Sequence, residues 1–171
     1  MEGQFYVGYG CYRKSLFLPQ AWLGKRVALE FQAAFQAAEV YVNGQLAGSH
    51  KGGYTPFAVD MTELLRPGEN LVFVRVNNLW DSRQAPRAGE HVFNGGIYRD
   101  VSLLVTDPVR VAWEGVWVTT PQASRERALV EVQTEVENLT AQKRSFRLSS
   151  VVKYQGGSGG PGGVPRGSRP W

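Results

Sequence analysis

The 171-residue chain has almost no cysteine, because Cys11 is the only one. A single thiol excludes an internal disulfide and any zinc site built from cysteine pairs, so the sequence indicates neither an oxidising compartment nor a structural metal. We interpret Cys11 as a small buried hydrophobe. Clusters of metal ligands and phosphate-binding loops are absent as well, and the sequence therefore predicts no metal and no cofactor.

Long apolar runs are also missing. A membrane-spanning helix needs an apolar stretch of about 18 residues or more, and a secretory signal needs a shorter apolar segment near the N-terminus. Neither pattern is present in the chain. The prediction is therefore no membrane partner and, by default, a cytoplasmic location.

The chain has no large excess of charge outside its final segment. Its formal net charge is +4, but Lys153, Arg166 and Arg169 lie in a C-terminal stretch without any acidic residue. Residues 1–152 carry 16 basic and 15 acidic residues. Binding to nucleic acid needs Lys and Arg clustered to face phosphates, so no nucleic-acid partner is predicted.

Long amphipathic helices are absent, and the dominant pattern is that of short strands. Apolar side chains recur at every second position in 27–32, with Ala28 expected on the wet face, and again in 101–105. Asn43 and Gly44 follow an apolar run and form the dipeptide that best suits the two positive φ angles of a type I′ hairpin turn. Closely spaced strands without intervening helices indicate an antiparallel β-sandwich or barrel.

Several motifs occur in a fixed order along this strand pattern. They are Gly10-Cys11-Tyr12-Arg13-Lys14, Val40-Tyr41-Val42-Asn43-Gly44, Gly52-Gly53-Tyr54-Thr55-Pro56-Phe57, Asp60-Met61-Thr62 and Asn94-Gly95-Gly96-Ile97-Tyr98-Arg99-Asp100-Val101. In this order they resemble the sugar-binding domain of glycoside hydrolase family 2, which includes β-galactosidases, β-mannosidases and β-glucuronidases. The chain is most similar to the β-galactosidase type.

The resemblance implies an all-β architecture in two parts. A jelly-roll-like, galactose-binding-like antiparallel β-sandwich is expected at 1–107 and is short at its N-terminus relative to the family. A truncated immunoglobulin-like β-sandwich is expected at 108–152, with only two or three of the usual strands. Residues 153–171 are rich in Gly and Pro and cannot bury enough apolar surface to offset their ordering entropy, so this tail is predicted to be disordered.

Glycoside hydrolysis needs a pair of carboxyl groups, about 5 to 5.5 Å apart in retaining enzymes. In the family that the chain resembles, both are glutamates of a barrel domain that would follow residue 152. Asp81 and Glu90 are the only acids that share a loop here, and nothing in the sequence desolvates either one. His50 and His91 have no nucleophile partner in a recognisable motif. We therefore predict no catalytic residue, and no hydrolysis by this chain alone.

The stretch Asn77–Asn94 combines amides, charged groups and aromatics, which is the chemistry that a polyhydroxylated ligand requires. The resemblance implies that this loop reaches the rim of the barrel active site, with Asn78 and Asp81 as the best-matched positions. Trp80 and His91 are further sugar-binding candidates. The alternative is an ordinary solvated loop.

The remaining motif residues are assigned structural roles. Gly95 and Gly96 are expected to reset the backbone before the next strand, Tyr98 to bury its ring, and Arg99 to hold a hydrogen-bonded guanidinium, with ligand contact as the alternative. The full set is Tyr12, Arg13, Asn43, Gly44, Gly95, Gly96, Tyr98 and Arg99.

The sequence thus predicts the non-catalytic, sugar-binding portion of a family 2 enzyme that hydrolyses O-glycosyl bonds. Its expected partners are a β-galactoside-type carbohydrate in the full enzyme and the catalytic barrel itself. Two alternatives stay open. The chain could be a free-standing carbohydrate-binding module, which would bind sugar without the barrel, or a structural domain whose exposed faces pack on the barrel.

Overall fold

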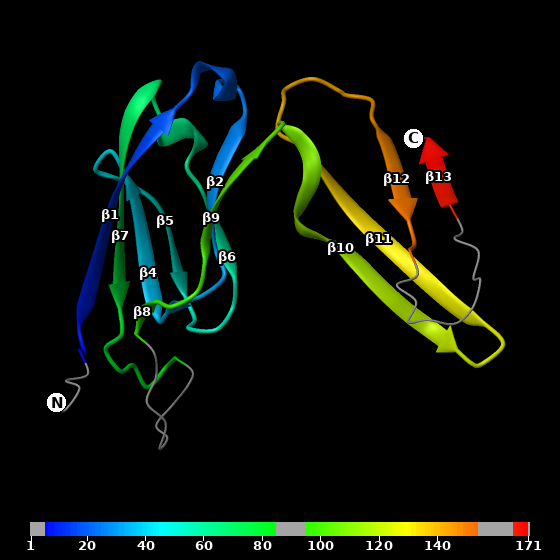
Figure 1. Ribbon diagram of the computed structural model, residues 1–171, viewed down its shortest axis with the longest axis horizontal. Helices are drawn as coiled ribbons and strands as arrows, with labels where there is room; N and C mark the ends of the chain where they lie inside the picture. The colour runs from blue at the N-terminus through cyan, green and yellow to red at the C-terminus, as the bar shows by residue number, and fades with distance from the viewer. Residues whose placement is uncertain (1–5, 85–94, 154–165, 171) are drawn as a thin grey trace. The chain divides into compact units, whose positions relative to one another are not determined.

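The structure, a computed structural model, describes residues 6–84, 95–153 and 166–170. Strands dominate these residues, and each of the two 3-10 turns, η1 (Gln20–Trp22) and η2 (Thr62–Leu64), is three residues long. The predicted all-β fold class is confirmed (Figure 1). The chain divides into two compact units, Met1–Glu137 and Asn138–Trp171, which are described separately below.

The first unit contains a four-stranded antiparallel sheet with the strand order β1-β7-β4-β5. Its strands are β1 (Tyr9–Leu18), β7 (Gly68–Asn77), β4 (Ala37–Val42) and β5 (Gln45–Lys51). β4 and β5 are joined through Asn43 and Gly44, whose φ angles are 51° and 85°. The predicted hairpin is therefore confirmed, and both of its central residues have the positive φ that a type I′ turn requires.

A second antiparallel sheet of three strands, ordered β6-β2-β9, belongs to the same unit. Its strands are β6 (Phe57–Asp60), β2 (Arg26–Phe31) and β9 (Val101–Thr106). A short additional pair joins β3 (Ala34–Phe35) to β8 (Gly96–Ile97).

The core of this sandwich consists of side chains that alternate along the strands of both sheets. Val40 and Val42 from β4 and Val72, Val74 and Val76 from β7 all belong to it. The rings of Phe31 and Phe57, on neighbouring strands of the second sheet, are stacked with centroids 4.6 Å apart. Burial of this apolar surface provides the main stabilisation of the sandwich.

Two expectations about burial were wrong. Cys11 is exposed, because it lies in the opposite phase of β1 to the buried Leu18 and β1 is the edge strand of its sheet. Ala28, expected on the wet face of β2, is completely buried. Trp113, in the strand that follows β9, donates a 2.8 Å hydrogen bond through Nε1 to the carboxylate of Glu30. That strand therefore covers the face of β2 on which Ala28 and Glu30 lie.

That strand, β10 (Val109–Ala123), pairs with β11 (Ala128–Asn138) to form a long hairpin. Beyond Trp113 most of its side chains are exposed, including Val116, Trp117 and Val118. The first compact unit ends at Glu137 and so includes this hairpin, while the boundary after residue 107 stays a prediction.

The second unit contains one pair of strands, β12 (Arg147–Val151) and β13 (Arg166–Pro170), in antiparallel register. Residues 166–170, which form β13, lie within the segment 153–171 that the sequence predicts to be a disordered tail. Pairing uses backbone N–H and C=O groups, which an edge strand such as β12 offers to any extended segment, so it does not depend on the apolar content of 166–170. Residues 154–165 lie outside the described part of the chain.

Candidate functional site

One end of the first sandwich brings together the residues that the sequence analysis singled out. Asn77, the last residue of β7, is in register with Tyr9 of β1 and with Ala37 of β4. The described part of the predicted sugar-binding loop, 77–84, leaves the sheet here, and the chain is described again from residue 95, where β8 pairs with β3. Of the four candidates, His91 lies outside the described residues. We call this region the β7–β8 end.

Asn78 is held in place by both of its side-chain polar atoms. Its Oδ1 accepts a 2.6 Å hydrogen bond from the backbone N–H of Gly8, and its Nδ2 donates a 2.9 Å hydrogen bond to the carbonyl of Tyr6. A Cβ on Gly95 would lie 2.2 Å from Nδ2. Asn78 therefore ties the start of β1 to the loop, and Gly95 leaves the space for its side chain.

Asp81 organises the next turn of the loop. Each of its carboxylate oxygens accepts two hydrogen bonds. Oδ1 accepts from the backbone N–H and Nε of Arg83, and Oδ2 accepts from an Nη of Arg83 and from Nε2 of Gln84. The hydrogen bonds from Arg83 and Gln84 hold the pKa of Asp81 far below its usual range. Its carboxylate thus stays ionised at neutral pH and is already satisfied within the loop.

Trp80, between these two anchored regions, is exposed, with 67% of the residue accessible. The preceding residue, Leu79, is fixed on both sides. Its N–H donates to Asn77 Oδ1 at 2.9 Å, and its carbonyl accepts from Nε2 of the buried Gln36 at 3.1 Å. The indole is therefore an exposed apolar group on a backbone that hydrogen bonds hold on both sides.

Tyr12 and Gly96 meet on the other side of the β7–β8 end. The Tyr12 hydroxyl oxygen accepts a 3.1 Å hydrogen bond from the backbone N–H of Ile97. Gly96 has φ of +83°, and a Cβ there would lie 2.3 Å from the same oxygen. Only glycine adopts this positive φ without strain and leaves room for the Tyr12 hydroxyl, because it has no Cβ.

Tyr98 is half-buried, and its hydroxyl donates a 2.6 Å hydrogen bond to the carbonyl of Gly53. Its ring contacts Tyr54 edge to face, with centroids 6.4 Å apart. Arg99 is exposed, and its guanidinium carbon lies 5.9 Å from the Tyr98 centroid. This geometry is a cation–π contact, and the hydrogen-bonded role of Arg99 stays a prediction.

Three motif residues lie away from this end. Asn43 and Gly44 are at the opposite end of β4, where the Asn43 amide bonds Leu71 N–H, Leu64 O and Asn70 Oδ1. Arg13 is an exposed residue in the middle of β1.

Sequence reasoning missed two residues that shape the site, Gln36 and Phe35. Gln36 is 3% exposed and bonds to the loop, and Phe35 contacts the Tyr54 ring edge to face at 5.8 Å. The sequence does contain a signal for Gln36, which is a polar residue within the otherwise apolar run 33–38.

In the described residues, groups of three or more His, Cys, Asp or Glu side chains that could hold a metal ion do not occur. Helices long and apolar enough to cross a membrane are likewise absent from this part of the chain.

Comparison with known proteins gives consistent matches. Residues 3–108 match the model of "Glycosyl hydrolases family 2, sugar binding domain". A Bacteroides fragilis protein named "Beta-glucuronidase" is 38% identical over 140 residues, covering 78% of this chain and 20% of the relative. A Thermoanaerobacter pseudethanolicus "Beta-galactosidase" is 35% identical over 158 residues, covering 82% and 21%. The chain thus spans about a fifth of the length of these curated relatives.

Solved structures agree with the sequence matches. A Bacteroides uniformis β-glucuronidase superposes with a TM-score of 0.81 at 36% identity, covering 85% of this chain and 18% of that one. A putative β-galactosidase from Bacteroides fragilis superposes with a TM-score of 0.84 at 35% identity, covering 98% and 26%.

Proposed function

Because the chain belongs to glycoside hydrolase family 2 and matches its sugar-binding domain, we propose that it is the sugar-binding portion of a β-glycosidase and that Trp80 is its principal ligand contact. The exposed indole offers an apolar face to the C–H side of a sugar ring, a contact that buries apolar area on both partners. Asn78 and Asp81 act by holding the loop in shape, and His91 remains a predicted contact.

The exposure of Trp80 between two anchored neighbours is the observation that carries this proposal. A ring on an already ordered backbone loses little conformational freedom when it binds, so less of the contact energy is offset by ordering the loop. The hydrogen bonds of Leu79 and Asp81 provide this order before any ligand arrives.

We propose a neutral, β-galactoside-type sugar as the ligand, and the pairing of charges in the described loop supports this choice over an acidic sugar. Arg83 is the one cation in 77–84, and its guanidinium is paired with Asp81. An anionic sugar would have to compete with that carboxylate, whereas neutral hydroxyl groups would not. Some relatives are named β-galactosidase and others β-glucuronidase. The proposed preference for a neutral sugar groups the chain with the β-galactosidases.

Hydrolysis of O-glycosyl bonds belongs, in this proposal, to the whole family 2 enzyme. The catalytic barrel is not among the 171 residues, and the chain matches about a fifth of its relatives' length. The sandwich contributes binding and orientation of the sugar, and the barrel supplies the two carboxyl groups.

The proposal is tested by titrating the full chain with methyl β-galactoside and methyl β-glucuronide and following the indole N–H signals by NMR. The Trp80 signal should shift more with the galactoside, and Trp80→Ala should weaken binding roughly tenfold, which corresponds to about 1.4 kcal/mol. Trp117→Ala is the matched control, because Trp117 is 49% exposed but lies on β10. Equal losses in the two variants would reject Trp80 as the contact.

A second candidate function is structural. Val116 and Val118 are exposed on one face of β10 and Trp117 on the other, and exposed apolar groups of this kind suit surfaces that pack on another domain. If the titration detects no sugar, and if a separately expressed family 2 barrel binds the chain but not its Trp117→Ser variant, this function is favoured over sugar binding.

A further inference from the structure

Asn43 and Gly44, the two residues of the β4–β5 turn, are also a pair in which an asparagine side chain reacts readily with its own backbone. The backbone nitrogen of Gly44 attacks Cγ of Asn43 and gives up its proton, while the Cγ–Nδ2 bond breaks and ammonia leaves. Water then opens the resulting succinimide ring on either side, which gives aspartate or isoaspartate. Glycine favours the attack because no side chain shields its nitrogen. Water is therefore the only co-reactant that this deamidation needs.

The folded turn ties the Asn43 side chain to three partners. Its Oδ1 accepts a 3.0 Å hydrogen bond from Leu71 N–H, and its Nδ2 donates to the Leu64 carbonyl at 3.0 Å and to Asn70 Oδ1 at 2.8 Å. Both protons of the side-chain amide are thus in use. Ring closure would turn Cγ towards the Gly44 nitrogen and release Nδ2, so these hydrogen bonds must break before the reaction can occur.

Asn70 is fixed in its own orientation. It is 3% exposed, and its Nδ2 donates to the carbonyls of Arg66 and Gly68 at 2.8 and 2.9 Å. Its Oδ1 also accepts a 2.9 Å hydrogen bond from Arg66 N–H. Both donors of Asn70 are therefore committed, and the atom that it presents to Asn43 is an acceptor.

The aspartate product does not fit this arrangement. A carboxylate oxygen would take the place of Nδ2 at residue 43, against the carbonyl of Leu64 and Oδ1 of Asn70. Three acceptors would then meet without a proton among them, which destabilises a site that is closed to water. Turning the Asn70 amide would offer a donor to the carboxylate but would break its hydrogen bonds to Arg66 and Gly68.

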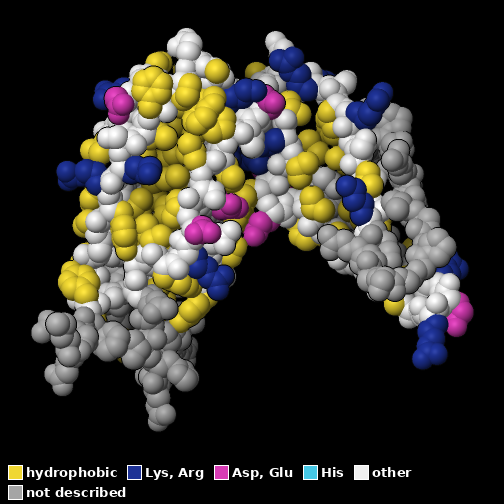
Figure 2. Space-filling model, in the orientation of Figure 1, with side chains coloured by type: hydrophobic (Ala, Val, Ile, Leu, Met, Phe, Trp, Pro, Cys, Tyr) yellow, Lys and Arg dark blue, Asp and Glu magenta, His cyan; other side chains and the backbone are white. Residues whose placement is uncertain are grey.

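The added negative charge is not itself the obstacle. Figure 2 shows Lys and Arg side chains together with Asp and Glu side chains on the visible face of the first sandwich. One more exposed carboxylate on such a surface changes stability little. The obstacle at residue 43 is the set of fixed acceptors around it.

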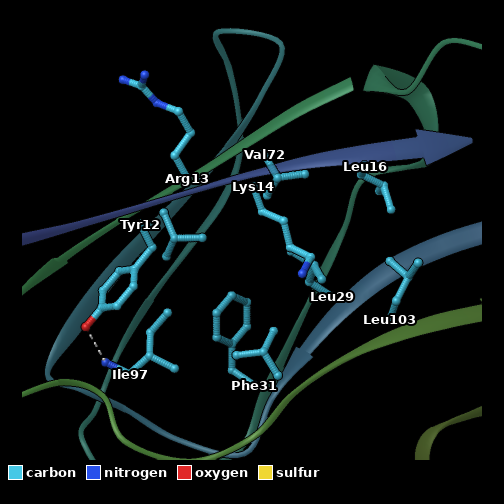
Figure 3. A pocket seen from close by; sticks show the side chains of 11 residues that line it. Tyr12, Arg13, Lys14, Leu16, Leu29, Phe31, Val72, Ile97 and Leu103 are labelled. Atoms are coloured by element: carbon cyan, nitrogen blue, oxygen red, sulfur yellow. Dashed lines mark hydrogen bonds between the residues drawn. The ribbon is translucent and has the colours of Figure 1, made fainter. Parts of the chain in front are cut away.

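The isoaspartate product is excluded by the register of the strands. It adds one carbon atom to the main chain within a two-residue turn. Val42, which precedes the turn, is completely buried and in register with Val72 of β7. The side chain of Val72 belongs to the core and lines the space between the two sheets (Figure 3). β4 therefore cannot slide to take up a longer turn without exposing its core residues.

From these observations we propose that Asn43 is a site of spontaneous modification that reacts only after the β4–β5 turn has separated from Asn70. The modification is a one-way step, because neither product restores the hydrogen bonds of the turn. Opening of this corner of the sandwich is thereby converted from a reversible fluctuation into permanent loss of the folded chain. The closed turn, with Nδ2 bound to two acceptors, protects the asparagine.

The first test compares deamidation of the full chain in native buffer and in concentrated urea at the same mildly alkaline pH. Trypsin then releases residues 27–51, between Arg26 and Lys51, in which Asn43 is the only asparagine, and mass spectrometry measures the modified fraction. The reaction should be slower by about tenfold or more in the folded chain, because it waits for the turn to open. Asn94-Gly95, which lies outside the described residues, is the other such pair and calibrates the reaction in urea. Equal rates for Asn43 in the two buffers would overturn the proposal.

Substitutions test the fit of the product. Asn43→Asp reproduces the aspartate form and should raise the equilibrium constant for unfolding by about tenfold or more. Gln45→Glu is the matched control, since it adds the same charge to the same hairpin at an exposed position. In an Asn70→Ala background, which lacks one of the opposing acceptors, Asn43→Asp should have a smaller effect. Equal effects of Asn43→Asp and Gln45→Glu would show that the turn accepts the product, and an undiminished effect in the Asn70→Ala background would refute the part assigned to Asn70.

The one-way step is tested without any substitution. The chain is partly deamidated in urea, returned to native buffer and separated by size-exclusion chromatography into compact and non-compact fractions. The modified form of residues 27–51 should be depleted by about tenfold from the compact fraction relative to the unmodified form. The same modified share in both fractions would mean that the products refold, and would overturn the proposal even if the folded chain reacts slowly.

Discussion

Replacing Gly96 with alanine should destabilise the first sandwich more than the same change at Gly44, although the two backbones are nearly alike. Their φ angles are +83° and +85°. An L-residue in this left-handed region costs about 1 to 2 kcal/mol, and this term is common to both variants. The difference between them therefore depends on what the added Cβ meets.

At Gly44 the new Cβ would have no heavy atom within 4 Å, whereas at Gly96 it would lie 2.3 Å from the Tyr12 hydroxyl oxygen. Tyr12 must then move, and the hydrogen bond from Ile97 N–H is lost. A net hydrogen bond is worth about 0.5 to 1.5 kcal/mol. Gly96→Ala should thus cost about 2 to 3 kcal/mol in the free energy of unfolding, against about 1 to 2 kcal/mol for Gly44→Ala.

A double-mutant cycle separates the two contributions. Without the hydroxyl oxygen, the nearest Tyr12 atom would be Cζ at 3.6 Å, an ordinary contact. In a Tyr12→Phe background, Gly96→Ala should therefore cost no more than Gly44→Ala, and the coupling energy should be about 1 kcal/mol. Urea unfolding followed by near-ultraviolet circular dichroism measures all of these values. Equal costs at the two glycines in the wild-type background would refute the reasoning.

Three further results are expected. The purified chain should release no product from nitrophenyl β-galactoside, β-mannoside or β-glucuronide, because a catalytic carboxylate pair is not among its residues, and turnover that disappears with Asp81→Asn would contradict this. Limited trypsin digestion should cut first within the described chain at Arg125 or Arg127, in the exposed turn between β10 and β11, and intact chain under conditions that cleave an unfolded control would argue against an open hairpin. Burial lowers the pKa of His50, whose ring stacks on Phe57 with centroids 4.2 Å apart, so the neutral form is favoured in the folded state. The free energy of unfolding should therefore fall as the pH drops below 6.5, the usual pKa, and should level off below the folded-state pKa. His50→Gln should remove this dependence, and an unchanged pH profile in that variant would assign it to another group.

Features that depend on neighbouring residues could be predicted from the sequence. Apolar alternation identified the strands at 27–31 and 101–105, because successive side chains of a strand point to opposite faces whatever the rest of the fold does. Asn43-Gly44 identified the hairpin because positive φ at two successive residues is a local requirement. The order of the motifs identified the family, which the match over residues 3–108 bears out.

Contacts between distant segments decided the rest. The Asn78 amide bonds to Gly8 and Tyr6, about seventy positions earlier in the chain, so its structural role could not be read from the loop alone. The exposure of Cys11 depends on β1 being an edge strand, and the burial of Ala28 depends on β10 covering β2. Local backbone and side-chain preferences determine which segments become strands and turns. Only the pairing of the sheets determines which side chains are covered and which polar atoms find partners.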